Sequence, residues 1–364
     1  MRLRRLTLQD FRNIPLAELS FRGRQQYFLG QNGQGKTNLL EAVGFVSALR
    51  SFRTADSALL INQGRRQGAI AAEFEHEKLG LSRVVITLRP GAKEVLCDGE
   101  RVTRLADFLG RFPTVVFSSQ DQQFIRGAPA LRRRWVDLVL AGISPPYLEA
   151  LTRYHRALEA RNQLLKSQSS FAEFSAFETP LAQAACDLIA GRRAGLAALA
   201  PPFAEAYAAL SAGAEPASFA YHPDTALADE SPAAWRAHFE KSRARDLQFR
   251  GTLSGPHRDD IVLTVGGRAA REYGSEGQQR SLVLALRLAQ LAHIRACTGV
   301  EPLLLADDVL GELDPERRRR FWTSLGEDRQ VLATGTELPA VELGAWEVFR
   351  VQAGAFSLTT DHPG

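Results

Sequence analysis

Residues 30–37 read Gly30-Gln31-Asn32-Gly33-Gln34-Gly35-Lys36-Thr37, a complete G-x-x-x-x-G-K-[ST] phosphate-binding loop. The loop follows the apolar run Tyr27-Phe28-Leu29, and a helical pattern continues from about Thr37 to Leu49. Its glycines let the backbone curl with N–H groups turned inward, and the next helix adds the positive end of its dipole. Lys36 supplies a mobile charge for the β and γ phosphates, while the Thr37 hydroxyl is placed to ligate Mg²⁺. The stretch therefore predicts a strand, loop and helix of an α/β fold that binds a nucleoside triphosphate with Mg²⁺.

The composition is typical of a soluble globular protein. Of 364 residues, 45% are hydrophobic and 24% are charged. The longest apolar stretch, residues 282–294, is interrupted by Arg287 and Gln290, and the basic start at residues 1–5 is followed by no apolar signal core. We therefore expect a cytoplasmic protein without a membrane span.

Charge and cysteine usage narrow the chemistry further. The 45 Lys and Arg against 41 Asp and Glu permit nucleic-acid binding without demonstrating it, since arginine runs such as 317–320 are most often solvated helix faces. The three cysteines show no C-x-x-C spacing, and the seven histidines form no H-E-x-x-H. Any metal is therefore expected on carboxylates, hydroxyls and phosphates.

The pattern along the chain changes twice. Up to residue 125 short apolar strands alternate with turns, and strands are expected at residues 3–8, 26–29, 69–74, 81–88, 94–97 and 114–117. The pattern is helical from Pro129 to Arg250, and then α/β again, with a strand at 260–265, a helix from 277 to about 296 and a buried strand at 303–305. We expect residues 1–125 and 251–364 to form one α/β nucleotide-binding domain, into which residues 126–250 insert a helical lobe.

Apolar residues in the lobe recur at the spacing of packed helices. Leu151, Leu158 and Leu165 lie seven residues apart with Leu148 beside them, and the return helix offers Phe171, Phe174, Leu181, Ala185 and Leu188. Two antiparallel helices packed through these positions predict a short arm. An ordinary helical subdomain without an arm is the alternative.

A second part of the nucleotide site is expected where the apolar run 302–306 ends in Asp307 and Asp308. This arrangement places carboxylates at the carboxyl edge of a sheet, beside the phosphate-binding loop. We assign Asp307 to Mg²⁺ and Asp308 to orienting or deprotonating the attacking water. A simple turn cap is the alternative for this pair.

The segment Ser275-Glu276-Gly277-Gln278-Gln279 opens an apolar helix and so predicts a second anion-binding end. It presents a hydroxyl, backbone N–H groups and a helix dipole. One triphosphate does not need two such ends from one chain, but both would be used if a second copy supplied one of them across a dimer interface. The alternative is a plain helix cap.

Together these motifs resemble the ABC-type ATPases, and among them the RecF family of bacterial recombination and gap-repair ATPases. The likeness covers nearly the whole chain. It rests on Asp10-Phe11-Arg12-Asn13, residues 30–41, Arg50-Ser51-Phe52-Arg53-Thr54, Arg132-Arg133-Arg134, Ser254-Gly255-Pro256-His257-Arg258-Asp259-Asp260, residues 275–279, and residues 303–314 with Gly311-Glu312-Leu313-Asp314.

The resemblance implies an ABC-type P-loop ATPase head whose inserted helical lobe bears a short antiparallel arm. In such proteins two protomers sandwich two ATP molecules, bind single-stranded DNA, duplex DNA and gap junctions, and cooperate with RecO and RecR in loading recombinase at stalled forks after DNA damage, in the SOS response. Weak hydrolysis then opens the dimer and releases DNA. Motif and resemblance together give a nucleotide-binding set of Gly30, Gln31, Asn32, Gly33, Gln34, Gly35, Lys36, Thr37, Asn38, Arg12, Asn13, Ser275, Gly277 and Gln278, with Thr37 and Asp307 on the metal and Lys36 and Asp308 in catalysis.

Three positions depart from related ATPases, and one of them is Ala306, which replaces the larger aliphatic residue expected before the two carboxylates. Gln120 lies where the family usually has a glutamate in the loop that links the lobes, and Thr334 lies where transporter ATPases carry a switch histidine. The departure at Thr334 favours a DNA-processing branch.

Three rival functions are compatible with a phosphate-binding loop. A transporter subunit normally has its signature turn much nearer that loop than the roughly 240 positions between Lys36 and Ser275. A chromosome-organising ATPase needs arms of hundreds of residues, whereas about 120 are available here, so only a short-armed form would fit. An ATP-gated scaffold without significant turnover remains open. For DNA contact the expected residues are Arg50, Arg53, Arg65 and Arg66, which follow the phosphate-loop helix.

Overall fold

The computed structural model describes residues 1–359 apart from 55, 168–170, 214, 228, 310, 312, 327 and 341–342, and it does not describe the side chains of residues 119, 171 and 172. The chain forms two compact units. Unit 1 contains residues 1–121, 205–214 and 283–364, and unit 2 contains residues 122–204 and 215–282. Residues 251–282, which the sequence pattern placed with the nucleotide-binding domain, thus group with the helical unit.

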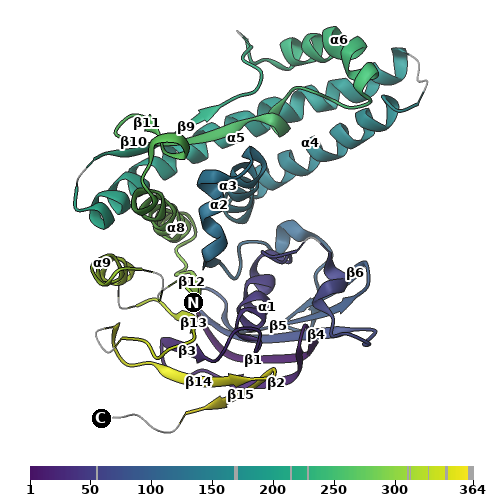
Figure 1. The fold of residues 1–364 in the computed structure, drawn as a ribbon. Coiled ribbons are helices and arrows are strands. Elements are labelled where there is room, and N and C mark those ends of the chain that lie inside the picture. The colour runs from purple at the N-terminus through teal and green to yellow at the C-terminus, as the bar shows by residue number, and fades with distance from the viewer. Residues whose placement is uncertain are drawn as a thin grey trace. The chain divides into compact units, whose positions relative to one another are not determined.

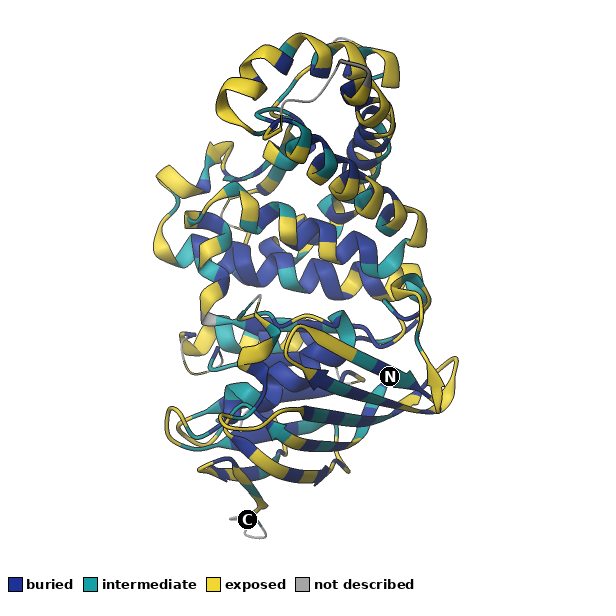
Figure 2. Cartoon of the chain, turned by 90° about the vertical axis from the view of Figure 1, so that its right-hand side faces the viewer, coloured by how far each residue is buried: buried dark blue, intermediate teal, exposed yellow. Residues whose placement is uncertain are grey.

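Unit 1 contains an antiparallel sheet, here called sheet 1, with the strand order β2-β1-β4-β5-β6-β7. Buried and exposed residues alternate along its strands, as Figure 2 shows, because one face covers the core and the other meets solvent. The turns between β5 and β6 and between β6 and β7 use positive φ values, with Gly91 at 73°, Asp98 at 53° and Gly99 at 86°. The strands are β1 (Arg2–Phe11), β2 (Ile14–Ser20), β4 (Gly68–His76), β5 (Gly80–Arg89), β6 (Ala92–Cys97) and β7 (Glu100–Arg101).

Sheet 2 of unit 1 has the order β15-β14-β3-β13-β12-β8 and is parallel except for β15. Its strands are β3 (Gln25–Leu29), β8 (Thr114–Ser118), β12 (Leu303–Asp307), β13 (Val331–Gly335), β14 (Glu347–Gln352) and β15 (Ala355–Leu358). Helix α1 (Lys36–Ala48) packs against β1 and β4 of sheet 1 and against β8, β12 and β13 of sheet 2, so it lies between the sheets (Figure 1). This position explains why the helix is buried almost all round. The short helices of the unit are η1 (Ser57–Leu60), η2 (Leu105–Asp107) and η3 (Ser119–Gln122), and α9 (Pro315–Leu325) lies near its C-terminus.

Unit 2 is mainly helical. Its elements are α2 (Gln123–Arg126), α3 (Pro129–Ile143), α4 (Pro145–Leu164), most of α5 (Phe171–Ser211), α6 (Pro232–Phe249), η4 (Pro256–Arg258), α7 (Ala270–Tyr273) and the start of α8 (Glu276–Thr298). A third sheet, with the order β11-β10-β9, is formed by β9 (Ala217–His222), β10 (Asp260–Val265) and β11 (Arg268–Ala269). The prediction of helix throughout residues 129–250 was therefore wrong at β9, a six-residue strand that pairs with β10 far along the sequence. This pairing also explains why the start of the predicted α/β return groups with unit 2.

Helices α4 and α5 form an antiparallel pair. Arg161 on α4 bonds Glu178 on α5, and nearer the start of α4 Arg153 bonds Asp187. On α5 the predicted Phe174, Leu181, Ala185 and Leu188 are buried, whereas Phe171 has no described side chain. On α4 and directly after it, the predicted Leu158 and Leu165 are buried, whereas Leu148 and Leu151 are only half-buried. Tyr147, Tyr154 and Arg161 on the same helix are also buried. The packed face of α4 therefore combines two of the predicted leucines with large polar side chains that have buried partners.

All six strands predicted in the first 125 residues are present, and so is the helix that follows the phosphate-binding loop. The same holds for the strands predicted at 260–265 and 303–305 and for the helix that starts near Gly277. In the described part of the chain no helix is long and apolar enough to cross a membrane.

Candidate nucleotide site

The phosphate-binding loop connects β3 to α1. Gly33 and Gly35 adopt positive φ values of 80° and 116°, which favour glycine. A Cβ on Gly30 would lie 2.4 Å from the Val351 carbonyl oxygen on β14, a separation that real contacts do not tolerate. The Gly30 N–H donates to the Gly335 carbonyl at 3.1 Å. Both backbone conformation and close approach therefore require the glycines of the motif.

The Lys36 ammonium is held inside the loop. Its Nζ donates to the carbonyl oxygens of Gly30 at 2.7 Å and Gln31 at 3.2 Å, and the residue is only 3% exposed. Helix α1 begins at Lys36, and among the described residues no side chain caps its N-terminus. Uncapped N–H groups at a helix start, beside a mobile cation, form an anion-binding site. The geometry of the loop and of the start of α1 therefore suits phosphate binding, as the motif predicted.

Neighbouring segments support the loop from two sides. Asn13 Nδ2 donates to the Gly33 carbonyl at 3.3 Å, and Asn38 Nδ2 donates to Asn13 Oδ1 at 2.7 Å. From the turn between β14 and β15, Ala353 N donates to Gln34 Oε1 at 2.7 Å. Asn13, predicted to approach the nucleotide, thus lies against the loop itself.

The carboxylate pair lies next to the start of α1. Asp307 Oδ1, at the end of β12, is 2.8 Å from the Thr37 hydroxyl and 3.0 Å from the Thr334 hydroxyl on β13. Asp308 follows at φ 56°, and its N–H donates to Thr334 Oγ1 at 2.9 Å. Thr334, at the position of the transporter histidine, also lies 3.3 Å from Asp308 Oδ1 through its hydroxyl, so it contacts both carboxylates.

The electrostatics of this pair fit a cation site. Burial, followed by the charge of Asp308, raises the pKa of Asp307, and the hydrogen bonds from Thr37 and Thr334 oppose the rise. A hydroxyl and a carboxylate oxygen side by side are ligands that suit Mg²⁺, which fills its other positions with water and phosphate oxygens. The described residues contain no group of three or more His, Cys, Asp or Glu that could hold a metal. Thr37 and Asp307 are therefore the residues that would hold Mg²⁺, together with a bound triphosphate.

Sequence reasoning missed Glu41, which lies one turn after Thr37 on α1 and is fully buried. Arg12, predicted to approach the nucleotide, adopts φ 54° and makes a two-pronged ion pair with this residue: Nε donates to Oε2 at 2.9 Å and Nη2 to Oε1 at 2.8 Å. Glu41 falls within the 30–41 stretch, but an acid on a helix ordinarily signals an exposed face. The burial of Glu41 could not be predicted from the local sequence, because its partners Arg12 and Ser51 come from other segments.

The predicted second anion-binding end lies in unit 2, at the start of α8. Ser275 Oγ accepts from Gln278 N at 3.2 Å, and Gln278 Oε1 accepts from Ser275 N at 2.8 Å. This reciprocal pair is a capping box, so the alternative of a helix cap is present. Gln278 Nε2 also donates to Glu215 at 2.6 Å, while Ser275 is exposed and Gly277 half-buried. No described residue accepts the Ser275 hydroxyl proton, so this proton can be donated to an anion.

The loop residue Gln120 lies in η3 and is exposed. Its neighbour Asp121 is buried and forms a two-pronged ion pair with Arg287, at 2.7 and 3.0 Å. The departure from the family's glutamate thus lies at an exposed residue, whose neighbour Asp121 is held in place by Arg287. Glu312, in the Gly311–Asp314 segment, lies outside the described residues.

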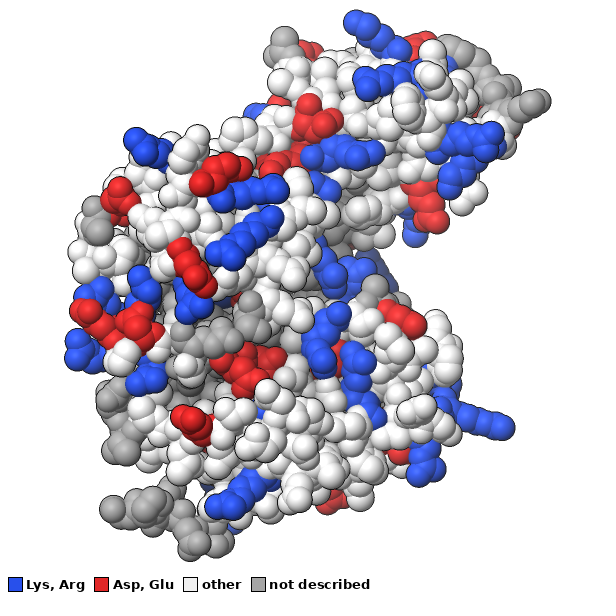
Figure 3. Space-filling model, viewed as in Figure 1, with Lys and Arg blue, Asp and Glu red and all other residues white. Residues whose placement is uncertain are grey.

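The four arginines predicted to contact DNA differ in their surroundings. Arg50 and Arg66 are exposed, and Arg65 Nε is 3.2 Å from Asp10 Oδ1. Arg53 is held by Asn38 Oδ1 at 2.7 Å and by Glu41 Oε2 at 3.3 Å. Figure 3 shows cationic and acidic side chains interspersed over the face in view.

The run 254–260, one of the segments that carry the resemblance, makes buried polar contacts with several other segments of unit 2. Asp260 forms a two-pronged ion pair with Arg132, at 2.7 and 2.9 Å, and Asp259 accepts from Arg192 at 3.1 Å. His257 Nδ1 is 2.7 Å from the Tyr154 hydroxyl. Burial lowers the pKa of His257 to about 4, so its ring is neutral near pH 7.

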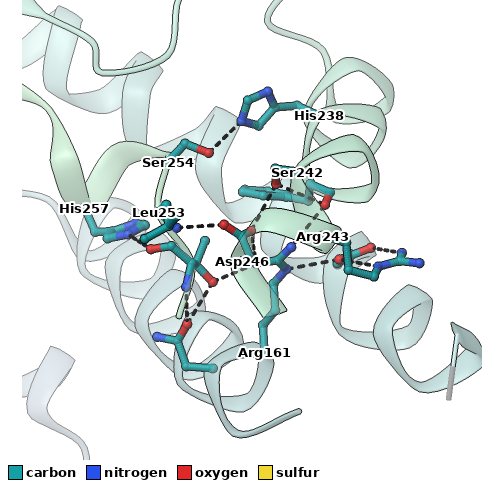
Figure 4. Close-up of polar contacts among 12 residues, drawn as sticks. Arg161, His238, Ser242, Arg243, Asp246, Leu253, Ser254 and His257 are labelled. Atoms are coloured by element: carbon teal, nitrogen blue, oxygen red, sulfur yellow. Dashed lines mark hydrogen bonds and ion pairs between the residues drawn. The ribbon is translucent and has the colours of Figure 1, made fainter. Parts of the chain in front are cut away.

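A second buried polar cluster connects this run to α4, α5 and α6 (Figure 4). Arg161 is fully buried and donates to Glu178 at 3.0 Å, Asp246 at 2.8 Å and the Thr252 hydroxyl at 2.8 Å. His257 Nε2 is 3.0 Å from the Thr252 carbonyl. The charged and polar residues of this run therefore stabilise unit 2 by connecting its segments.

Comparisons with known proteins agree with these features. The RecF/RecN/SMC N terminal domain family model matches residues 2–353. The DNA replication and repair protein RecF of Synechococcus sp. (strain JA-2-3B'a(2-13)) is 39% identical over 97% of each chain. The protein of that name from Anaeromyxobacter dehalogenans (strain 2CP-1 / ATCC BAA-258) is 38% identical, over 98% of this chain and 99% of the relative.

Solved structures show the same likeness. The recombination mediator protein RecF of the RecFOR pathway, in structures named for ATPrS and for ATP, matches with a TM-score of 0.90 at 27% identity and covers 98% of this chain. The matches cover 98% and 97% of those chains. An Smc head bound to the C-winged helix domain of ScpA matches with a TM-score of 0.56 at 17% identity, over 99% of this chain and 97% of that one, which is a likeness of fold alone.

Proposed function

Since this chain belongs to the RecF family of DNA replication and repair proteins, we propose that it is an ATP-dependent DNA clamp of recombinational and gap repair. ATP drives two protomers together around DNA, and weak hydrolysis releases it. RecR and RecO are the expected protein partners.

One observation carries the proposal: the Thr37 hydroxyl and Asp307 carboxylate lie 2.8 Å apart, beside the uncapped start of α1. When Mg²⁺·ATP binds, Lys36 exchanges the carbonyl oxygens of Gly30 and Gln31 for phosphate oxygens, and Asp308 orients the attacking water. Positioned charges of this kind supply most of the catalysis in phosphoryl transfer.

The proposed dimer uses the second anion-binding end. Ser275 and the N–H groups of Gly277 and Gln278 of one protomer meet the γ phosphate held by the phosphate-binding loop of its partner. Two features support this role: the Ser275 hydroxyl proton has no acceptor among the described residues, and Ser275 lies at the start of the long helix α8. DNA meets the closed dimer through Arg50, Arg65 and Arg66, with Arg53 as a further candidate.

Fluorescence anisotropy of labelled single-stranded, duplex and gapped DNA, with ATP, with ADP and without nucleotide, tests the proposal. ATP should tighten binding by roughly 5- to 150-fold, the usual range of coupling between two sites. Lys36→Ala should abolish the gain because it removes the phosphate cation, whereas Lys166→Ala, at an exposed lysine just after α4, should retain it. Equal affinity in all three nucleotide states would refute the clamp.

A further inference from the structure

The Glu41 carboxylate, which has no solvent access, accepts four hydrogen bonds from three residues. Besides the two nitrogens of Arg12, its Oε1 accepts the Ser51 hydroxyl, and its Oε2 accepts Arg53 Nη1 at 3.3 Å. Ser51 Oγ in turn accepts the backbone N–H groups of Arg53 at 2.9 Å and Thr54 at 3.0 Å. The carboxylate therefore fixes both the Arg53 side chain and the backbone that carries it.

This cluster continues into the phosphate-binding loop. Arg53 Nη1 also donates to Asn38 Oδ1 at 2.7 Å, and Asn38 contacts Asn13, which bonds the Gly33 carbonyl. Asn13 Oδ1 also lies 3.0 Å from the place a Cβ on Gly35 would occupy. An unbroken path of hydrogen bonds thus runs from Glu41 to the loop that would hold the phosphates.

The same arginine acts on the metal carboxylate through its charge. Arg53 is among the groups that oppose the rise in the pKa of Asp307. Removing the charge of Glu41 would take from Arg12 and Arg53 the carboxylate that both of them contact. A buried carboxylate whose partners also contact the nucleotide site constrains the geometry of that site as well as the fold.

We propose that Glu41 is a positioning residue of the nucleotide site, whose carboxylate sets Arg12 and Arg53 and, through Arg53, Asn38 and Asn13, the phosphate-binding loop. This inference rests on the proposed ATPase function, and it identifies a residue that acts on the site through the side chains it holds. It also assigns Arg53 first to the nucleotide site.

Glu41→Gln tests the inference, because the amide keeps the size of the side chain and one acceptor oxygen while removing the charge. We expect kcat for ATP hydrolysis to fall roughly 10- to 100-fold, as small misplacements at a reacting centre do, with a smaller change in the ATP dissociation constant. The matched control is Glu94→Gln on β6, since Glu94 also holds two arginines, Arg89 and Arg101, but at the surface. The control should keep the wild-type kcat.

A double-mutant cycle separates positioning from stability. If Glu41 acts through Arg53, then Arg53→Gln should reproduce the loss in kcat, and the double variant should be no slower than the slower single variant. Losses that multiply, or a folded Glu41→Gln protein with wild-type kcat, would overturn the inference. If Glu41→Gln fails to fold, Arg53→Gln tests the inference instead, because the Arg53 guanidinium is partly exposed. An unchanged kcat in Arg53→Gln would also overturn the inference. Wild-type protein that binds no ATP in the same titrations would instead refute the proposed function.

Discussion

Gly30→Ala is the sharpest local perturbation of the site. The new Cβ would meet the Val351 carbonyl oxygen at 2.4 Å, whereas ordinary contacts begin at about 3.4 Å, so β3 and β14 must separate locally by about 1 Å. The residue that moves carries the carbonyl oxygen bonded to Lys36. A displacement of 1 Å at a reacting centre costs about 100-fold in rate. We expect kcat/KM for ATP to fall by about that factor.

The assay measures ATP hydrolysis at several ATP concentrations, with thermal unfolding of each variant measured in parallel. Gly23→Ala is the matched control in unit 1, because its Cβ would meet nothing closer than 3.7 Å. The control should hydrolyse ATP at the wild-type rate. If folded Gly30→Ala protein keeps kcat/KM within about threefold of wild type, the steric reasoning about the loop is wrong.

Three further predictions address the metal, the water and DNA. Asp307→Asn should stabilise the nucleotide-free protein against urea near neutral pH, because the raised pKa of Asp307 means that its ionisation in the folded state costs free energy. The gain in the free energy of unfolding should shrink as the pH falls through the folded-state pKa toward the ordinary value of 3.8. A gain that persists in acid would contradict this prediction. Asp308→Asn should keep the ATP dissociation constant and slow turnover roughly 100- to 10,000-fold, the range for a general base, and undiminished turnover would remove Asp308 from catalysis. The triple variant Arg50→Gln, Arg65→Gln and Arg66→Gln should flatten the salt dependence of duplex binding by about 0.9 in slope for each DNA phosphate that the protein no longer neutralises, and an unchanged slope would exclude this footprint.

Local sequence signals predicted most of the framework of the site. The phosphate-binding loop, the helix after it and the strand ending in Asp307 are each specified within a few residues, by glycine chemistry or by an apolar run. The capping box at Ser275 is equally local, since a serine and a glutamine three positions apart suffice for it. These features could be identified without knowing what packs around them.

Features that depend on distant partners could not be predicted in this way. Glu41 is buried because Arg12 and Ser51 arrive from other segments, and the α4 seam uses Tyr154 and Arg161 because Glu178 and the 252–260 run supply their partners. Short strands show the same limit. The segments of β13 and β14 were not predicted as strands, and both pair in parallel with β3, which the apolar run had already indicated.

ATP-dependent dimerisation, measured by sedimentation velocity, tests the central claim most directly. Wild-type protein should shift from monomer to dimer with Mg²⁺·ATP and not without it, and Ser275→Arg should bind ATP yet remain monomeric. Ser231→Arg is the matched control, because Ser231 caps α6 by accepting from Ala234 N at 3.2 Å, so its loss tests capping alone. That control should still dimerise. A wild-type protein whose mass is the same with and without ATP, or a Ser275→Arg protein that dimerises with ATP, would contradict a nucleotide site shared between two protomers.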